Sequence, residues 1–267
     1  MKTKIRLETP DDYYAVEELT REAFWKTLWG IDGQVICDEH LLVPRLRGCP
    51  SFVPELDFVA ELEGRIVGHI IYSKSRVEGD NGETYETLTF GPLSILPAYQ
   101  GKGIGKEMMR HSFAEAKRLG YRAVLIFGHP DYYPRVGFRR ASAFGISASD
   151  GTNRDAFMAY PLYEGALDGV HGRYFIDPVH ETLTQKDALD FDKRFPAKER
   201  HIPAPIDLVL ARLEARARAS IQALACHTLA LLSTNSEREL RALEGVDDDA
   251  ISTIRDVLRE FGYLWGA

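Results

Sequence analysis

Apolar and polar residues alternate in short runs over the first part of the chain, and these runs predict strands separated by helices. Residues 2–8 have the alternation of a first strand. Thr9 followed by Pro10 is typical of a helix start, and we expect this helix to continue to about Trp25. A second helix is predicted over residues 39–46.

The middle of the chain adds further strands and one long helix. The turn-forming pair Glu63-Gly64 separates two apolar runs and so predicts a hairpin. The predicted elements are, in order, strands at 57–62, 65–73 and 84–96, a helix at 104–119, a strand at 122–127, a short helix at 129–136 and strand-like pieces from 137 to 163. This order predicts an α/β fold.

The pattern changes after residue 165. Residues 177–205 mix aromatic, charged and proline residues as a connector does, and residues 208–266 have the pattern of short helices. We therefore expect a first domain over 1–165, a connector over 166–205 and a small helical domain over 206–267.

A glycine-rich loop joins the strand at 84–96 to the helix at 104–119. Gly101, Gly103 and Gly105 lack the Cβ atoms that would keep a phosphate from the backbone, and the new helix presents unpaired N–H groups to an anion. The loop is typical of a pyrophosphate cradle. It is not a Walker loop, because Glu107 follows Lys106, and a dinucleotide fingerprint would need glycine at 106.

The motif Gln100-x-x-Gly103-x-Gly105 after a hydrophobic strand resembles the coenzyme A loop of the GCN5-related N-acetyltransferase (GNAT) superfamily, and the element order over residues 1–165 is similar too. The resemblance implies a mixed, mostly antiparallel twisted sheet flanked by helices. It also implies an acyl-CoA-dependent N-acyltransferase that moves an acetyl group from acetyl-CoA directly to an amine. The implied cofactor-binding residues are Leu93, Ser94, Ile95, Gln100, Gly101, Lys102, Gly103, Ile104, Gly105, Lys106, His129 and Tyr132.

The departing thiolate needs a proton, and the segment from Tyr133 to Phe138 resembles the superfamily's Tyr-x-x-x-Gly-Phe element. The resemblance implies that Tyr133 is the general acid, with Tyr132 as its rival. A pair of tyrosines that only fills space between helix and sheet is the structural alternative. By the same resemblance, a backbone N–H near Ser94 or Ile95 polarises the thioester carbonyl.

A general base is harder to assign. Glu86 lies on the strand at 84–96 and is our catalytic candidate, although Thr89 is nearer the position that many relatives fill with glutamate. A water relay is the alternative. His129 and Asp131 follow the next strand and are further candidates, with a capping role favoured for Asp131.

The segment from Cys37 to His40 collects metal-capable residues, but adjacent positions on a helix cannot direct all their ligands at one ion, so no metal site is predicted. The resemblance places the acceptor pocket in this region, with Glu39 and His40 as contacts and Trp25 and Trp29 nearby. Asp38 as a helix N-cap is the structural alternative.

The composition of the chain indicates which classes of binding partner suit it. The net charge of −7 disfavours nucleic acid and anionic membranes and fits a cationic, small-molecule or peptide amine acceptor. Three separated cysteines indicate reduced thiols rather than a disulfide framework. The sequence begins without an apolar signal segment and contains no run as long as a membrane span, so we expect a cytoplasmic protein.

A second resemblance lies near the end of the chain. Residues 254–266 look like the last helix and tail of the C-terminal domain that bacterial RNA polymerase carries on its alpha chain, an all-α helix-hairpin fold. Residues 244–249 carry aspartates where that family carries lysines, so we expect repulsion of DNA and a role in protein binding, self-association or packing. The competing function is a non-catalytic acyl-CoA sensor that acts through these helices.

Overall fold

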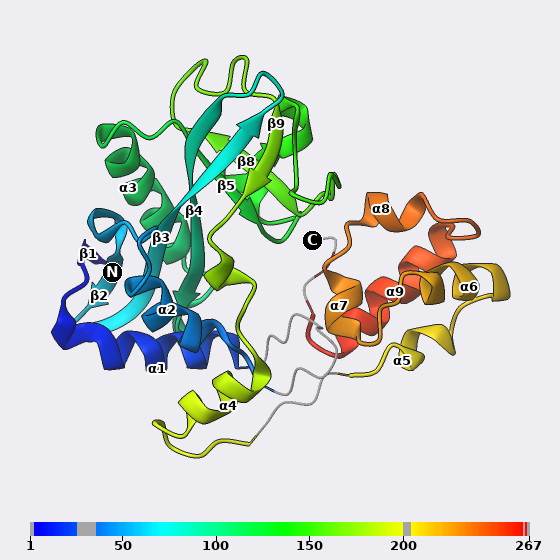
Figure 1. The fold of residues 1–267 in the computed structure, drawn as a ribbon. Helices are drawn as coiled ribbons and strands as arrows, with labels where there is room; N and C mark the ends of the chain where they lie inside the picture. The colour runs from blue at the N-terminus through cyan, green and yellow to red at the C-terminus, as the bar shows by residue number, and fades with distance from the viewer. Residues whose placement is uncertain (1–2, 26–35, 200–203, 264, 266–267) are drawn as a thin grey trace.

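The computed structural model describes residues 3–25, 36–199, 204–263 and 265 (Figure 1). Helices and strands alternate in the order predicted for the first half of the chain. The strands are β1 (Lys4–Leu7), β2 (Phe58–Leu62), β3 (Arg65–Gly79), β4 (Thr84–Ile95), β5 (Ala123–Phe127), β6 (Arg139–Arg140), β7 (Ile146–Ser147), β8 (Phe157–Pro161) and β9 (Gly172–Phe175). The helices are α1 (Tyr13–Phe24), α2 (Glu39–Arg47), α3 (Ile104–Arg118), α4 (Gln185–Asp192), α5 (Asp207–Leu210), α6 (Ala215–Ala223), α7 (Leu229–Ser233), α8 (Glu237–Arg241) and α9 (Asp248–Glu260).

The strands form one mixed sheet in the order β1-β2-β3-β4-β5-β8-β6. Neighbours along this path are antiparallel except β4 and β5, which run parallel and pair at the single position Leu88↔Val124. Beyond that pair the two strands separate. An opening is therefore formed between the carboxyl ends of β4 and β5, where backbone groups lack a strand partner.

Helices cover both faces of the sheet, and strand alternation assigns each side chain to a face. On β2, Phe58 and Ala60 join the core beneath α3, whereas Val59 packs with residues of α1 and α2. The same alternation continues on β5, where Val124 belongs to the α3 side and Leu125 to the opposite side.

Two features of the sheet differ from the prediction. Strand β3 continues to Gly79, six residues beyond the predicted end, because its second half finds a partner that the sequence did not reveal. That partner is β9, which pairs antiparallel with Arg76–Gly79 and lies within the range expected to be connector. The four residues of β9 are too few for alternation to be recognised. The predicted short helix at 129–136 is a 3₁₀ turn over Tyr133–Val136.

The C-terminal helices α5 to α9 bury their own apolar cluster, which includes Leu229, Ile254 and Trp265, and Figure 1 shows them grouped beside the sheet. Helix α9 begins at Asp248, and the Asp247 side chain accepts a hydrogen bond from the Ala250 N–H at 3.0 Å. The aspartates of this segment therefore cap a helix and occupy its first turn. The resemblance to the polymerase domain stays a prediction.

One buried carboxylate joins the helical group to the sheet. Asp155, which precedes β8 and is 2% exposed, accepts hydrogen bonds from Ser236 Oγ at 2.5 Å and Arg238 Nε at 3.0 Å. Arg140 pairs with the same carboxylate at 2.8 Å. The Asp155 N–H in turn donates to Glu239 Oε1 at 2.9 Å. Helix α8 is thus fastened to the loop before β8.

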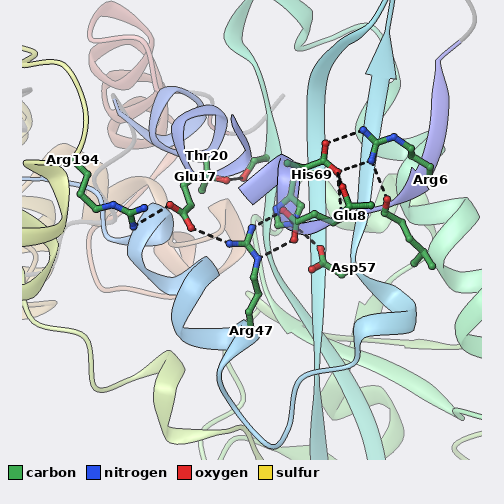
Figure 2. Close-up of polar contacts among 12 residues, drawn as sticks. Arg6, Glu8, Glu17, Thr20, Arg47, Asp57, His69 and Arg194 are labelled. Atoms are coloured by element: carbon green, nitrogen blue, oxygen red, sulfur yellow. Dashed lines mark hydrogen bonds and ion pairs between the residues drawn. The ribbon is translucent and has the colours of Figure 1, made fainter. Parts of the chain in front are cut away.

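A second buried polar network lies between the sheet and helices α1 and α2 (Figure 2). Arg47 donates to both oxygens of Glu8, at 2.6 and 2.9 Å, and to Glu17 at 3.0 Å. His69 Nε2 lies 2.8 Å from Asp57 Oδ1. Burial is the main cause that raises the pKa of Glu8 to about 7 and of Asp57 to about 6 and lowers the pKa of His69 to about 4. Proton sharing among Glu8, Asp57 and His69, together with the Arg47 charge, therefore reduces the cost of burying these ionisable side chains.

The sequence predicted no metal site, yet Glu8, Asp57 and His69 bring one ligand atom each within 4.8 Å of the others. They come from three separate segments, so spacing along the chain could not reveal them. Arg47 already occupies both Glu8 oxygens, and we assign the group to the core. Among the described residues, no helix is long and apolar enough to cross a membrane.

Candidate active site

The glycine loop turns the chain from β4 into α3. Gly101 and Gly103 have φ of +71° and +85°, a region that residues with a Cβ rarely adopt, and Gly103 is the N-cap of α3. Gln100 Nε2 donates to the Ile95 carbonyl at 3.0 Å and Lys102 Nζ to the Ala98 carbonyl at 2.8 Å. These two side chains therefore brace the turn.

A cavity of about 530 Å³ extends from this loop to the opening between β4 and β5. It contains most of the residues predicted to bind the cofactor or act in catalysis. The predicted residues that line it are Leu93, Ile95, Gln100, Gly101, Gly103, Ile104, Gly105, Lys106, Tyr132 and Tyr133. Ser94, Lys102, His129 and Glu86, also predicted, are not among its lining residues.

Strand register decides which backbone groups face the opening. The Leu96 N–H donates to the Val67 carbonyl at 3.0 Å, so in this antiparallel pair Ser94 directs its backbone groups at its partner His69 on β3. Leu93 and Ile95 direct theirs away from β3, toward the cavity. The Ser94 side chain is buried and donates to Thr20 Oγ1 on α1 at 3.0 Å. Of the two predicted carbonyl-polarising groups, the Ile95 N–H has the suitable direction and the Ser94 N–H does not.

Two neighbouring tyrosines occupy different parts of the cavity. The Tyr132 hydroxyl lies over Gly105, 3.5 Å from the position a Cβ would take there. The Tyr133 ring packs with Phe90 on β4 and with Phe138, at centroid distances of 6.0 and 5.4 Å. Tyr132 is therefore at the phosphate end and Tyr133 at the strand opening. Burial raises the pKa of the Tyr133 phenol, which keeps it protonated and able to donate a proton at neutral pH.

Glu86, the candidate general base, lies in the opposite half of β4. It is seven residues before Leu93, which corresponds to roughly 20 Å along a strand. Its carboxylate is 56% exposed and pairs with Lys74 at 3.2 Å. This placement does not support a catalytic role, because the thioester would lie near the opening. The sequence shows that Glu86 and Leu93 belong to the same strand, but it does not show which part of that strand lies beside the thioester.

The other base candidates are placed as follows. Thr89 is buried and sits opposite Ser73 in the β3–β4 pair. His129 Nδ1 accepts the Asp131 N–H at 3.3 Å and lies 4.0 Å from an Asp131 carboxylate oxygen. His129 and Asp131 thus shape the turn that leads to Tyr133, and His129 is not placed against the cavity where the sequence expected cofactor contact.

The segment expected to contact the acceptor is turned into the protein. His40 is fully buried between Phe191 and Phe195, and its Nε2 lies 3.4 Å from Asp192. Glu39 is 8% exposed. The Trp25 indole donates to the Glu199 carbonyl at 2.7 Å, so it faces the connector. Trp29 lies outside the described residues. His40, which the sequence assigned to acceptor contact, is therefore buried by the packing of α4 on α2.

Several lining residues were not predicted. They come from the end of α1, the 3₁₀ turn before the loop and the 3₁₀ turn that carries Tyr133: Ala23, Phe24, Tyr99, Arg135 and Val136. Only Arg135 had a usable signal, since a cation two residues after Tyr133 suits a phosphate ligand. Lys106 also lines an adjoining cavity of about 250 Å³ together with Arg110 and Lys117, so basic side chains continue along α3.

Comparison with known proteins agrees with this geometry. Residues 17–139 match the acetyltransferase (GNAT) family. The uncharacterized N-acetyltransferase YjhQ of Escherichia coli K12 is 34% identical over 97 residues, which are 36% of this chain and 53% of YjhQ, so the chain spans about half the length of that relative. The uncharacterized N-acetyltransferase YhbS of the same strain is 27% identical over 168 residues, 63% of this chain and 92% of YhbS.

Two crystal structures have a similar fold. One is the GNAT family N-acetyltransferase YhbS from Escherichia coli in complex with CoA, with a TM-score of 0.59, 26% identity and coverage of 69% of this chain and 94% of that one. The other is a GNAT family acetyltransferase from Brucella melitensis in complex with acetyl-CoA, with a TM-score of 0.52, 26% identity and coverage of 67% and 98%.

The family match includes β2 to β5, α3 and the glycine loop, the parts on which the predicted fold depended. It confirms, at the level of the superfamily, the expectation of an acyl-CoA-dependent acetyltransferase. Residues 17–139 therefore match the acetyltransferase (GNAT) family, and the fold is similar to that of two GNAT acetyltransferases crystallised with CoA and acetyl-CoA.

Proposed function

We propose that this protein transfers an acetyl group from acetyl-CoA to an amine by direct attack within a ternary complex. The observation that carries the proposal is the continuous cavity from the glycine loop to Tyr133, bounded by the unpaired edge of β4. Its length and chemistry suit a ligand with a diphosphate at one end and a thioester at the other.

The diphosphate end is the turn into α3. Gly101 and Gly103 leave their backbone N–H groups accessible, and the positive end of the α3 dipole adds to the attraction of an anion. Lys106 and Arg135 line the same cavity and supply positive charge. In our proposal Arg110 and Lys117, in the adjoining cavity, extend this charge to the remaining phosphate of the cosubstrate.

The thioester end is the opening between β4 and β5. The backbone groups of Leu93 and Ile95 that face the opening would bond the extended arm of acetyl-CoA as an added strand does. The same N–H groups can hold the carbonyl oxygen, on which negative charge develops as the amine attacks. Tyr133 then protonates the departing thiolate.

The competing function is an acyl-CoA sensor without turnover. Both functions need the glycine loop, but only an enzyme needs a proton donor at the thioester end. The separate placement of Tyr132 and Tyr133, with a protonated Tyr133 beside Phe90, favours the enzyme.

Titration calorimetry and one matched pair of variants test the proposal. Acetyl-CoA should bind well above ATP or NAD, and a preference for either nucleotide would contradict the assignment. Tyr133→Phe should lower kcat by about 10²- to 10⁴-fold with little change in acetyl-CoA affinity. Tyr132→Phe is the control because it removes the same atom at the phosphate end. Equal effects of the two variants would refute the role of Tyr133.

For the C-terminal helices we propose packing on the sheet or binding of protein rather than DNA, since acidic residues form the first turn of α9. A gel-shift assay at low salt with the full chain tests this. Tight binding of duplex DNA would contradict it.

A further inference from the structure

A second, smaller cavity lies on the face of the sheet opposite α3. Its volume is about 160 Å³, and it is formed by the end of β5, by β9 with the segment after it, and by the loop between β7 and β8. The lining residues are Phe127, Ala148, Ser149, Asp150, Thr152, Arg154, Tyr174, Ile176 and Glu181.

The small cavity lies across the end of β5 from Tyr133, which lines the cofactor cavity. Gly128 has the Tyr133 ring packed against it, on the cofactor side. Phe127, one residue earlier, stacks on Phe157 at 4.7 Å and belongs to the opposite side. Consecutive strand residues point to opposite faces and rise by about 3.3 Å, so Phe127 and the Tyr133 ring lie on opposite sides of the chain at the end of β5.

Tyr174 reaches the place where β4 and β5 begin to separate. Its hydroxyl donates to the Leu125 carbonyl at 3.2 Å, one residue after the last β4–β5 pair at Val124. Tyr174 is 2% exposed, and its ring packs on Phe157 at 5.0 Å. The floor of the small cavity is therefore next to the opening into which the thioester would extend.

The lining is suited to a cation. Two aromatic residues, Phe127 and Tyr174, line it and pack on the buried Phe157, and aromatic faces attract ammonium groups. Two carboxylates outnumber the one guanidinium of Arg154. The Asp150 carboxylate is already engaged, because Oδ1 accepts from the Thr152 N–H at 2.9 Å and from the Thr152 hydroxyl at 2.7 Å.

Glu181 is the carboxylate that remains available. Within the part of the chain that the structure describes, its side chain has no hydrogen bond or ion pair, in contrast to Asp150. Burial, with a smaller contribution from the Glu181 charge, raises the pKa of the Tyr174 phenol, which places the two groups in electrostatic contact.

We propose that this cavity receives the acceptor as a primary alkylammonium arm, and that Glu181 holds the ammonium group and accepts its proton before attack. The inference rests on the proposed function and adds the acceptor class and the base.

The reaction balances with these residues. The ammonium loses one proton through Glu181 to solvent, and the neutral nitrogen forms a bond to the thioester carbon. Collapse breaks the C–S bond, Tyr133 protonates the thiolate, and the second nitrogen proton returns to Tyr133 through solvent. The sum is R–NH3⁺ plus acetyl-CoA giving R–NH–COCH3, CoA thiol and one proton.

Three acceptors and two variants test the inference. A free diamine, 1,5-diaminopentane, and a peptide-like amine, Nα-acetyllysine methylamide, carry the proposed arm and distinguish the two sources of such an acceptor. Aniline is a neutral amine at the assay pH. Glu181→Gln should lower kcat/KM for the alkylammonium acceptors by about ten-fold or more at pH 7.5 and recover toward wild type at higher pH, where more amine is already neutral.

The control variant is Glu78→Gln, which removes the same charge from an exposed position on β3 outside the cavity. It should match wild type in all assays. An equal loss for aniline and the alkylammonium acceptors in Glu181→Gln would show a structural role and overturn the inference. So would wild-type turnover of aniline alone.

Calorimetry with acetyl-CoA distinguishes a failure of this inference from a failure of the proposed function. If Glu181→Gln binds acetyl-CoA like wild type and still acetylates alkylammonium acceptors with unchanged kcat/KM and pH profile, the inference is wrong and the proposed function stands. If wild type does not bind acetyl-CoA, both are wrong.

Discussion

Tyr133 packs its ring against Gly128 so closely that a Cβ atom at Gly128 would overlap it. Gly128 follows β5 directly, and its backbone does not have the positive φ that would require glycine. Glycine is needed there because a side chain would collide with the Tyr133 ring. The position of the proposed acid is thus set by a residue that takes no part in the chemistry.

Gly128→Ala is therefore expected to displace the Tyr133 hydroxyl from the thioester. We expect kcat to fall by about ten-fold or more, because a misplacement of about 1 Å can lower a rate by about 100-fold. Acetyl-CoA affinity should change little, since the diphosphate is held at the other end of the cavity. Steady-state kinetics and calorimetry measure the two effects. Gly48→Ala, where a Cβ meets only ordinary contacts, is the control. Unchanged kcat in Gly128→Ala would argue against Tyr133 as the acid.

The glycine loop gives a prediction about binding alone. Gly103→Ala places a Cβ at φ +85°, which costs about 1–2 kcal/mol of backbone strain, and puts a methyl group where the diphosphate is proposed to lie. We expect the Kd of CoA to rise by more than about ten-fold.

Gly64→Ala is the matched control for this prediction. Gly64 has φ +78° in the hairpin turn between β2 and β3, with nothing within 4 Å of an added Cβ. It carries similar strain but does not line the cofactor cavity, so melting temperature should fall in both variants and CoA affinity in Gly103→Ala only. An equal loss of affinity in both would indicate a general stability effect.

The sequence was sufficient to predict the parts of the site that are formed by consecutive residues. The glycine loop, its strand and its helix are consecutive, and Gly101 and Gly103 adopt the conformations for which glycine is selected. The cofactor cavity could be predicted in large part because its walls come from that one segment. Phe24 was missed because α1 is distant from that segment along the chain, whereas Arg135 lies two residues after Tyr133 and its charge was a usable signal.

The second cavity could not be predicted at all. Tyr174 and Glu181 line one cavity only because β9, a strand of four residues, pairs with the far half of β3. Glu86 was chosen from the sequence as a carboxylate on the right strand, and the structure places it at the wrong end. The direction of a strand relative to its partners is a tertiary property that residue type does not carry.

Buried His40 predicts an acid-sensitive contact between α2 and α4. Burial lowers its pKa to about 4, with the Asp192 charge opposing and the Arg21 charge adding to the shift. Between about pH 6.5 and about 4 the unfolded chain binds a proton that the folded chain does not, so stability is lost as the pH falls through this window. The loss reaches at most about 3 kcal/mol for a shift of this size.

Chemical denaturation from pH 7.5 to pH 4.5 tests this contribution. His40→Gln should have a lower free energy of unfolding at pH 7.5 but a smaller decrease toward acid pH than wild type. His171→Gln is the control, because His171 is exposed. Parallel pH profiles for wild type and His40→Gln would show that His40 does not contribute.

The contact between Asp155 and Arg238 predicts that the C-terminal helices affect the acceptor side of the sheet. Asp155 directly follows Arg154, which lines the small cavity, so helix α8 holds one end of the loop that forms that cavity. Removing one partner of a buried ion pair costs about 3–5 kcal/mol when the other is left unpaired, and less here because Arg140 still pairs with Asp155.

Arg238→Gln should therefore increase hydrogen exchange in α8 and in residues 148–155 and raise the KM for the amine, while acetyl-CoA affinity is unchanged. Arg241→Gln is the control, since the partners of Arg241, Glu237 and Asp248, lie within the helical group itself. That variant should increase exchange in α8 without a change in the amine KM. If Arg238→Gln alters exchange in α8 alone, the helices are attached to the sheet but do not position the loop.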